Sequence, residues 1–335
     1  MELRKDPITR SWVITGDEPA APRTSQVFCR FCPESSQQPQ VITTMASVNY
    51  GPWSARAVVH PDPLYRVEGD PGRRGVGIYD CMRTVGAHEV IVENSRHDRQ
   101  LWTADVEEIE QFLLLCADRI RDLKNDHRFK YVCVFKDFGP QSGQEFDHPS
   151  TQIVATTFVP RRVLYELRAA RDHFAHKERC VFCDILSQEM QDKSRVVEVR
   201  GNFVATVPYA PRVPFETWIL PQSHDAHFER AALSQPGAMR DCAELLRHTL
   251  TRILSVADAF HLVLHTAPNT QHKSKVLNYW RTIDEDYHWH IEILPILAGK
   301  AKPYSFKEVY FTPVSPETAA ARLREAPTDM PHSRM

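Results

Sequence analysis

Phe146-Asp147-His148-Pro149-Ser150-Thr151-Gln152-Ile153-Val154 is the stretch from which the fold of this chain can be inferred. The apolar run from Tyr131 to Gly139 precedes it and predicts a strand that enters a glycine-bearing loop. Val154 to Val159 predicts a second buried strand, closed by Pro160. A His-Pro-x-x-Gln segment is weak evidence by itself, so its meaning depends on the residues at matching places elsewhere in the chain.

The composition is that of an ordinary globular protein. A chain of 335 residues can form two domains or one large duplicated domain. Lys+Arg 41 against Asp+Glu 43 gives no bias toward polyanions, so we expect no nucleic-acid binding. No apolar run approaches the roughly 20 residues of a membrane helix, so we expect no membrane association. The first residues lack the apolar core of a signal peptide, which predicts a cytoplasmic protein.

The same order of parts occurs twice along the chain. Each occurrence contains a Cys-x-x-Cys pair, strands, a lone histidine after a strand, a long helix and a strand that begins His-x-Ser or His-x-His. The first long helix is expected from Val106 to Lys124, with Thr103 as its N-cap, and the second from Pro236 to Val256. The repeat predicts two similar α+β halves, each an antiparallel sheet with a helix packed across one face.

We place the N-terminal half at residues 1–175 and the C-terminal half at 176–315. Residues 316–335 form a tail, with a helical pattern from Arg322 to Glu325 and an end that we expect to be disordered.

The cysteine pairs have metal-ligand spacing. Cys-x-x-Cys places two thiolates on one turn, where both can reach one Zn²⁺. Histidines at matching places complete two sets of four ligands: Cys29, Cys32, His97 and His148 in the first half, and Cys180, Cys183, His224 and His288 in the second. Four protein ligands leave no position for water, so both zinc ions are expected to be structural. The alternative is that the cysteines are reduced structural thiols and the histidines are surface residues. The remaining cysteines (Cys81, Cys116, Cys133 and Cys242) are expected in the core.

Several further motifs accompany these ligands along the chain. They are Glu2-Leu3-Arg4-Lys5-Asp6-Pro7 with Trp12-Val13-Ile14, Gly86-Ala87-His88-Glu89-Val90-Ile91, Pro214-Phe215-Glu216-x-Trp218-Ile219-Leu220-Pro221 and Tyr287-His288-Trp289-His290-Ile291-Glu292. With the two Cys-x-x-Cys pairs, the chain resembles the galactose-1-phosphate uridylyltransferase family of the histidine-triad superfamily. It is similar to the plant-type ADP-glucose phosphorylase branch, which also has the second Cys-x-x-Cys. The resemblance covers nearly the whole chain and implies tandem histidine-triad-like halves, a homodimer and a role in carbohydrate metabolism.

The resemblance also implies an activity, the transfer of a nucleoside monophosphate between a nucleotide sugar and a sugar phosphate or other phosphate. In the family's His-Pro-His-x-Gln motif, the first His binds metal, the second attacks the α-phosphate, and the Gln binds phosphate oxygens. By position, His148 is the metal ligand, Gln152 binds phosphate, and Ser150 stands in the nucleophile's place. Asp137, near the phosphates, and His60, near the nucleoside, stand where family members commonly have Asn. An added carboxylate at Asp137 would repel a diphosphate unless it is protonated or paired.

Ser150 is the main departure from the family pattern. Imidazole forms a phosphoramidate, which passes its nucleotidyl group on readily, whereas serine would form a far more inert phosphodiester and needs an adjacent base to attack. Three hypotheses therefore stay open. The chain is a nucleotidyltransferase that acts by direct transfer, a nucleotide-binding pseudoenzyme or sensor, or a hydrolase or phosphorylase of dinucleotides.

The repeat also makes His290 the counterpart of Ser150. In better-known family members a His at this place helps to bind a second metal, with residues that correspond to Glu166 and His265 here. Because Cys180 and Cys183 offer a better set for zinc, His290 is a candidate nucleophile or general base. The competing interpretation is a packed histidine on an edge strand.

Overall fold

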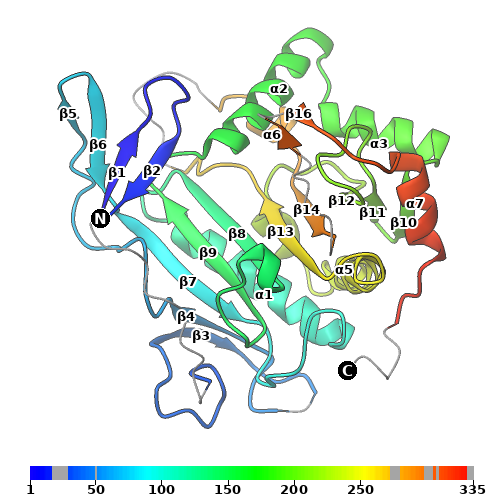
Figure 1. Ribbon diagram of the computed structural model, residues 1–335, viewed down its shortest axis with the longest axis horizontal. Coiled ribbons are helices and arrows are strands. Elements are labelled where there is room, and N and C mark those ends of the chain that lie inside the picture. The colour runs from blue at the N-terminus through cyan, green and yellow to red at the C-terminus, as the bar shows by residue number, and fades with distance from the viewer. Residues whose placement is uncertain (17–28, 50, 272–279, 298–304, 307–308, 330–335) are drawn as a thin grey trace.

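The computed structural model describes residues 1–16, 29–49, 51–271, 280–297, 305–306 and 309–329 (Figure 1). The strands are β1 (Glu2–Lys5), β2 (Trp12–Thr15), β3 (Val41–Met45), β4 (Ala55–Val59), β5 (Arg74–Val76), β6 (Tyr79–Arg83), β7 (Gly86–Val92), β8 (Tyr131–Phe138), β9 (Ser150–Thr156), β10 (Val196–Arg200), β11 (Phe203–Thr206), β12 (Thr217–Pro221), β13 (Ala259–His265), β14 (His290–Ile296), β15 (Ser305–Phe306) and β16 (Val309–Tyr310). The helices are α1 (Val106–Leu123), η1 (Pro140–Ser142), α2 (Arg161–Lys177), α3 (Val181–Asp192), α4 (Phe228–Ala232), α5 (Arg240–Ile253), α6 (Ile283–Asp286) and α7 (Pro316–Glu325).

One ten-stranded sheet runs through the molecule in the order β10-β11-β12-β14-β13-β8-β9-β7-β4-β3. The two sides of this sheet correspond strand by strand when each is read outward from the centre. One side has the order β8, β9, β7, β4 and β3, and the other has the order β13, β14, β12, β11 and β10. The two sides meet where β8 pairs antiparallel with β13, from Phe138 opposite Phe260 to Val134 opposite Leu264. The predicted α+β class with two similar antiparallel halves is therefore confirmed, and the halves share one sheet.

The strand that carries the His-Pro segment begins earlier than predicted. The sequence predicted a strand from Val154 to Val159, whereas β9 spans Ser150–Thr156 and pairs with β7 over its whole length. Alternate residues explain this, because Ile153 and Ala155 are fully buried in the core whereas Ser150 and Gln152 are only partly buried on the opposite face. The prediction relied on a continuous apolar run, and the first residues of β9 lack such a run because one face of the strand is polar.

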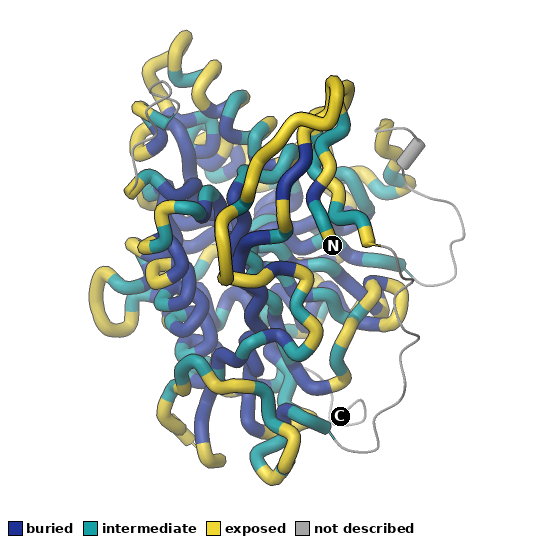
Figure 2. Tube along the Cα trace, turned by 90° about the vertical axis from the view of Figure 1, so that its left-hand side faces the viewer, coloured by how far each residue is buried: buried dark blue, intermediate teal, exposed yellow. Residues whose placement is uncertain are grey.

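Helices α1 and α5 pack against each other and cover one face of the sheet (Figure 1). The buried side chains of α1 recur at helical spacing, among them Ile109, Phe112 and Ile120. The N-cap is Asp105 and not Thr103 as predicted, because Asp105 and Glu108 form a reciprocal capping box with each other's backbone N–H groups. Figure 2 shows that the buried residues fill the interior of the molecule, whereas the exposed residues lie at its periphery.

The remaining elements surround this sheet. β2, β1, β6 and β5 form a separate four-stranded sheet, in which β5 and β6 pair as an antiparallel hairpin. Helix α3 was not predicted; it begins directly after Cys180, its N-cap. Helix α7 starts at Pro316, earlier than predicted, because Ser315 caps it through the backbone N–H of Thr318. The expected disorder of the tail's end concerns residues 330–335, outside the described residues. In the described part of the chain, no helix is both long and apolar enough to cross a membrane.

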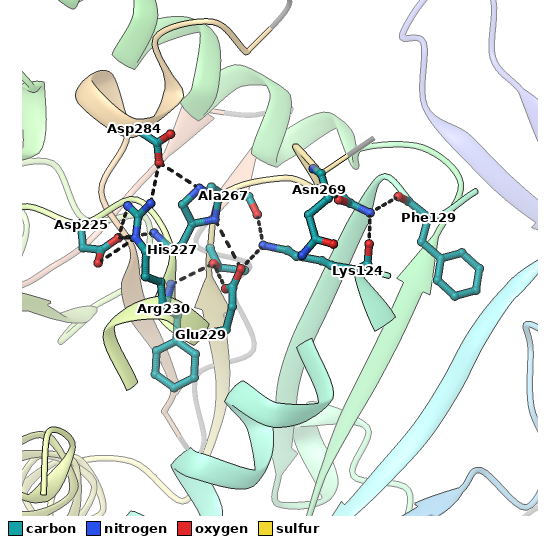
Figure 3. A network of polar contacts seen from close by, with 12 residues as sticks. Lys124, Phe129, Asp225, His227, Glu229, Arg230, Ala267, Asn269 and Asp284 are labelled. Atoms are coloured by element: carbon teal, nitrogen blue, oxygen red, sulfur yellow. Dashed lines mark hydrogen bonds and ion pairs between the residues drawn. The ribbon is translucent and has the colours of Figure 1, made fainter. Parts of the chain in front are cut away.

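A buried polar network joins the two halves behind the sheet (Figure 3). The Lys124 Nζ at the end of α1 donates to Glu229 Oε1 of α4 at 2.5 Å and to the carbonyl of Ala267 at 2.8 Å. The Asn269 side chain donates to the carbonyls of Lys124 at 2.7 Å and Phe129 at 3.0 Å. The Asn269 side chain, a group of the second half, thus satisfies the carbonyl of Lys124, the C-cap of α1. The predicted division after residue 175 stays a prediction, and that residue lies inside α2.

Candidate functional site

The first four predicted metal ligands lie together just before the start of β9. His148 Nδ1 is 3.4 Å from Cys29 Sγ and 3.8 Å from Cys32 Sγ, and His97 Nδ1 is 3.6 Å from Cys32 Sγ. One ligand atom from each of the four residues lies within 4.8 Å of every other. The sequence prediction that these residues converge is correct.

His148 is held in the orientation that a ligand needs. Its Nε2 donates to the carbonyl of Asn94 at 2.8 Å, which leaves Nδ1 directed at the two sulfurs. The Asn94 side chain in turn donates to Glu108 of α1 at 3.0 Å. Burial lowers the pKa of His148 to about 4, so the imidazole is neutral at pH 7, the form that binds metal.

The second predicted set converges in the same way. Cys183 Sγ lies 3.4 Å from His224 Nδ1 and 3.6 Å from His288 Nδ1, and Cys180 completes the cluster. Both histidines again use Nε2 for a backbone carbonyl, His224 for that of Asp284 at 2.9 Å and His288 for that of Pro221 at 2.9 Å. Two thiols with two oriented imidazoles are a suitable donor set for one metal ion, so each cluster could hold one.

A third group of ionisable side chains is buried beneath α2, on the face of β13 and β14 opposite α1 and α5. His265 Nδ1 lies 2.9 Å from Glu166 Oε2 and its Nε2 lies 3.3 Å from Glu292 Oε2. The His290 ring stacks on His265 at 4.6 Å between centroids. Arg212 Nη2 donates to Glu292 Oε2 at 2.6 Å. Glu166, His265 and His290 could together hold a metal ion.

The two histidines of this group differ in charge. Burial disfavours the charge of His265, but Glu166 and Glu292 outweigh burial and raise its pKa to about 10. Burial, followed by the neighbouring His265, lowers the pKa of His290 to about 4. His290 is only 1% exposed and its Nδ1 lies 3.1 Å from the His288 carbonyl. It is thus placed in the interior and not among the residues that line the pocket described next.

A polar pocket opens along β8 and β9, beside the first metal cluster. Its lining comprises Gln100, Phe135, Lys136, Asp137, Gln144, Glu145, Phe146, His148, Pro149, Ser150 and Gln152. It therefore contains three of the predicted catalytic and substrate-binding residues, Asp137, Ser150 and Gln152. The remaining predicted substrate-binding residue, His60, does not line the pocket but contacts Glu145, with its Nε2 3.3 Å from Glu145 Oε1.

The backbone of Ser150 is anchored from below. Lys136 Nζ donates to the Ser150 carbonyl at 3.2 Å and to both oxygens of Glu93 at 2.9 and 3.1 Å. Thr151 Oγ1 also donates to Glu93, at 2.7 Å. Lys136 and Glu93 are both buried, so this pair fixes the first residue of β9 to β8. Among the described residues, Ser150 Oγ makes no hydrogen bond to a histidine or a carboxylate.

Gln152 is oriented by a chain of hydrogen bonds that starts at the backbone. The N–H of Leu64 donates to His88 Nδ1 at 3.2 Å, so the ring proton of His88 is on Nε2. That Nε2 lies 2.8 Å from Gln152 Oε1, which directs the amide nitrogen of Gln152 toward Glu145 Oε2 at 3.2 Å. Burial, followed by His60, lowers the pKa of His88 to about 4, which keeps this ring uncharged at pH 7.

Asp137 and His60, the two residues that stand where Asn was expected from the resemblance, both have partners. His261 Nδ1, on the neighbouring strand β13, lies 2.6 Å from Asp137 Oδ1, so the repulsion expected between this carboxylate and a phosphate is reduced by a pairing across the central seam. His60 stacks on His88 at 3.9 Å between centroids. Its Nδ1 accepts the N–H of Asp62 at 3.0 Å. The contacts of His261 with Asp137 and of His60 with His88 have no sequence pattern, because the two members of each pair lie far apart in the chain.

Sequence reasoning missed Glu145, which contacts both His60 and Gln152 in the pocket. Its position three residues before His148 is the only signal in the sequence, and a carboxylate in a loop is ordinarily solvated. Sequence reasoning also missed Arg212 and Glu292 in the third group, although Glu292 stands in the same strand as His290.

The chain is similar to known proteins over nearly its whole length. The chain is 28% identical to the ADP-glucose phosphorylase of Arabidopsis thaliana, over 97% of this chain and 92% of that protein. It is 25% identical to the galactose-1-phosphate uridylyltransferase of Thermotoga maritima, over 98% of this chain and all of that protein. Residues 79–159 also match the N-terminal domain of a family described as a domain of unknown function (DUF4931).

Solved structures show the same architecture. A uridylyltransferase structure superposes with a TM-score of 0.79 at 24% identity, covering 97% of this chain and 98% of that chain. The Arabidopsis thaliana ADP-glucose phosphorylase, solved with bound ADP-glucose, gives a TM-score of 0.73 at 26% identity and covers 98% of this chain and all of that one.

Proposed function

We propose that the protein is a nucleotidyltransferase acting on a nucleotide sugar. It would transfer the nucleoside monophosphate to a sugar phosphate or another phosphate. The proposal rests on the homologues of this chain, which are galactose-1-phosphate uridylyltransferase-family proteins that include ADP-glucose phosphorylase. The observation that carries the proposal is the pocket along β8 and β9, which places Gln152 and Ser150 beside the His148 cluster and lies in a chain similar to these enzymes over nearly its whole length.

The surroundings of Ser150 favour direct transfer of the nucleoside monophosphate over a covalent intermediate. A serine hydroxyl needs an adjacent base to attack phosphorus, and the described residues place no histidine or carboxylate in hydrogen-bond contact with Ser150 Oγ. Gln152 is fixed by His88 with its amide N–H₂ directed into the pocket, where it can stabilise charge that develops on a phosphate oxygen. An oxygen of the acceptor phosphate would then attack the α-phosphorus itself, while the bond from that phosphorus to the bridging oxygen breaks and the sugar 1-phosphate leaves. Because both substrates must be bound at once, this predicts sequential kinetics.

Both Cys2His2 clusters are proposed to hold Zn²⁺. Their donor sets match the preference of zinc for thiolate and imidazole, and all four positions of a tetrahedron are filled by protein. The ions would therefore be structural, and the first would fix His148, two residues before Ser150. A homodimer, as expected from the resemblance, is part of the same proposal.

The test is a turnover assay with pairs of substrates. ADP-glucose or UDP-glucose is incubated with inorganic phosphate, glucose 1-phosphate or galactose 1-phosphate, and initial rates are measured over a grid of both concentrations. Intersecting double-reciprocal lines and no nucleotidyl adduct in the intact mass are expected. Parallel lines with an adduct would contradict direct transfer, and absence of turnover with every pair would contradict the enzyme proposal.

A second candidate function, a nucleotide-binding pseudoenzyme, is favoured by the same unactivated serine. It predicts binding of ADP-glucose or UDP-glucose without turnover, and a gain of an intact-mass adduct only in the Ser150→His variant. The hypothesis that His290 is the nucleophile predicts instead an adduct in the wild type that is lost in His290→Ala. The burial of His290 counts against this hypothesis, because a nucleophile must reach its substrate.

A further inference from the structure

Two N–H groups, one on the buried His60 and one on the partly buried Gln152, point at the same carboxylate in the lining of the pocket, that of Glu145. The His60 Nδ1 accepts the N–H of Asp62, so the ring proton of His60 is on Nε2. The Gln152 Oε1 faces the Nε2–H of His88, so the amide nitrogen of Gln152 supplies the second donor. Both orientations are imposed by backbone N–H groups, those of Asp62 and Leu64, and do not depend on a ligand.

The group that now faces these donors is the carboxylate of Glu145. Its Oε1 lies 3.3 Å from His60 Nε2 and its Oε2 lies 3.2 Å from Gln152 Nε2. Both distances are long for hydrogen bonds to a charged acceptor. His60 is only 2% exposed, and among the described residues its Nε2 has no aligned hydrogen bond. The donor is thus buried and incompletely satisfied, which costs free energy that a better-placed anion would recover.

Glu145 is placed so that it can leave. Its side chain is 37% exposed, in contrast to the buried rings behind it. It lies in the loop between β8 and β9, two residues after Gly143, whose backbone has a left-handed φ of 81° with open space around it. A carboxylate on such a loop can turn outward without disturbing β9.

We propose that His60 and Gln152 form an anion-binding subsite for a phosphoryl group, and that Glu145 is a tethered anion that occupies this subsite until the ligand displaces it. The subsite belongs to the proposed nucleotide-sugar pocket and so deepens that proposal. Glu145 then acts as a specificity residue, because only a ligand whose phosphoryl group binds both donors better than a carboxylate does can enter. Weakly bound anions are excluded.

The test measures binding of inorganic phosphate to the full-length protein and to variants. Glu145→Ala removes the tethered carboxylate and is expected to lower the Kd for phosphate at least tenfold. Asp147→Asn is the matched control, because it also removes one negative charge from the same loop but is exposed and does not line the pocket. It is expected to change the Kd less than threefold. Adding Gln152→Leu to Glu145→Ala is expected to abolish the gain in phosphate affinity. Thermal unfolding confirms that each variant is folded.

Two outcomes overturn the inference. The first is an equal gain in phosphate affinity in Glu145→Ala and Asp147→Asn, which indicates a general charge effect. The second is no gain in phosphate affinity in Glu145→Ala. Imidazole ¹⁵N shifts of His60 locate the bound phosphate, and an unchanged Nε2 shift on saturation would also contradict the subsite. Parallel titrations with ADP-glucose and UDP-glucose separate this result from the proposed function. If phosphate affinity rises in Glu145→Ala but no variant binds a nucleotide sugar, the result supports the subsite and contradicts the nucleotidyltransferase proposal. If the wild type turns over nucleotide sugars but phosphate affinity is unchanged in Glu145→Ala, the result supports the nucleotidyltransferase proposal and contradicts the subsite.

Discussion

At the scale of single residues, the backbone partner of each imidazole decides what that imidazole can bind. In His148 and His288, Nε2 is used by a backbone carbonyl, so Nδ1 is free to coordinate metal. In His60 and His88, Nδ1 accepts a backbone N–H, so Nε2 carries the proton and serves as a donor. The same side chain thus becomes a metal ligand in one group and a hydrogen-bond donor in the other.

The metal prediction follows from the first group. The wild-type protein is expected to contain two zinc ions per chain, and Cys29→Ser one. The loss removes the ion that fixes His148 and should lower the thermal midpoint, because the binding free energy of a structural zinc contributes to folding. Elemental analysis of the purified proteins gives the stoichiometry. Cys133→Ser, outside both clusters, is the control and should retain both ions; an unchanged zinc content in Cys29→Ser would contradict the assignment.

The pH prediction follows from the second group. The pKa of His88 is about 4 in the folded protein and roughly 6.5 in an unfolded chain. Because the unfolded state binds more protons between these values, the contribution of His88 is fully present above pH 6.5. It is lost as the pH falls toward 4, at up to about 1.4 kcal/mol per pH unit.

Urea unfolding of wild type and His88→Gln at pH 7, 6 and 5 measures this contribution. The free energy of unfolding should fall less steeply on acidification in His88→Gln than in wild type. His176→Gln, a change at an exposed histidine, is the control and should follow wild type. Identical pH profiles for wild type and His88→Gln would show that His88 does not supply the dependence.

The sequence predicted the metal ligands and named His60 and Gln152 as substrate-binding residues, but it did not predict how these two donors are oriented, for a physical reason. Two cysteines separated by two residues are close in any turn, so the Cys29 and Cys180 pairs can be recognised before the fold is known. The direction of the Gln152 amide depends on His88, which depends on the backbone of Leu64, and these residues lie on three separate segments. Such a relay exists only after the strands have paired.

At the scale of elements, α1 connects the first metal cluster to the second half. Its first turn holds Glu108, which binds Asn94 behind His148, and its last turn leads to Lys124 in the network of Figure 3. The Lys124–Glu229 pair is almost fully buried. Removing one member therefore leaves an uncompensated charge in the interior, which is far more costly than loss of a surface pair.

A double-mutant cycle tests this pair. Lys124→Met and Glu229→Gln are each expected to lower the free energy of unfolding by about 3 kcal/mol, whereas the double variant should lose clearly less than the sum. Urea denaturation provides the measurement. Glu107→Gln is the control, because Glu107 pairs with Arg240 between α1 and α5 at the surface, and it should have little effect. Additive losses would show that the two buried charges do not compensate each other.

Element boundaries were predicted least well where a polar side chain interrupts the hydrophobic pattern. β9 begins at Ser150 because its partner β7 pairs with the polar residues as well. Helix α3 begins at Val181, directly after its N-cap Cys180, where the metal-ligand spacing predicted only a turn. In contrast, α1 and α5 were predicted because their buried faces repeat at helical spacing over several turns.

At the scale of the whole molecule, the seam between β8 and β13 makes each half the partner that completes the other. One hydrophobic core runs beneath α1 and α5 and includes residues of both halves. A half without its partner would expose β8 or β13 as an unpaired edge together with the buried face of its helix.

Residues 1–175 and 176–335, expressed separately, are therefore expected to be insoluble or unfolded, whereas co-expression should give a soluble complex. Circular dichroism and size-exclusion chromatography of each half and of the co-expressed pair supply the measurement. A well-folded monomeric half would contradict the prediction, because it would show that the seam is dispensable.

The seam has one more consequence. Five matched strands on each side of an approximate two-fold axis, joined edge to edge by antiparallel pairing, are what two identical subunits would form if they associated through the same strand. The covalent chain thus contains within itself an arrangement of two copies, and each copy is free to change independently of the other. One copy retains an open pocket around Ser150, whereas the equivalent surface around His290 is enclosed beneath α2. The presence of both halves in one chain permits this difference between them, because in a symmetric pair of identical subunits every substitution would occur in both.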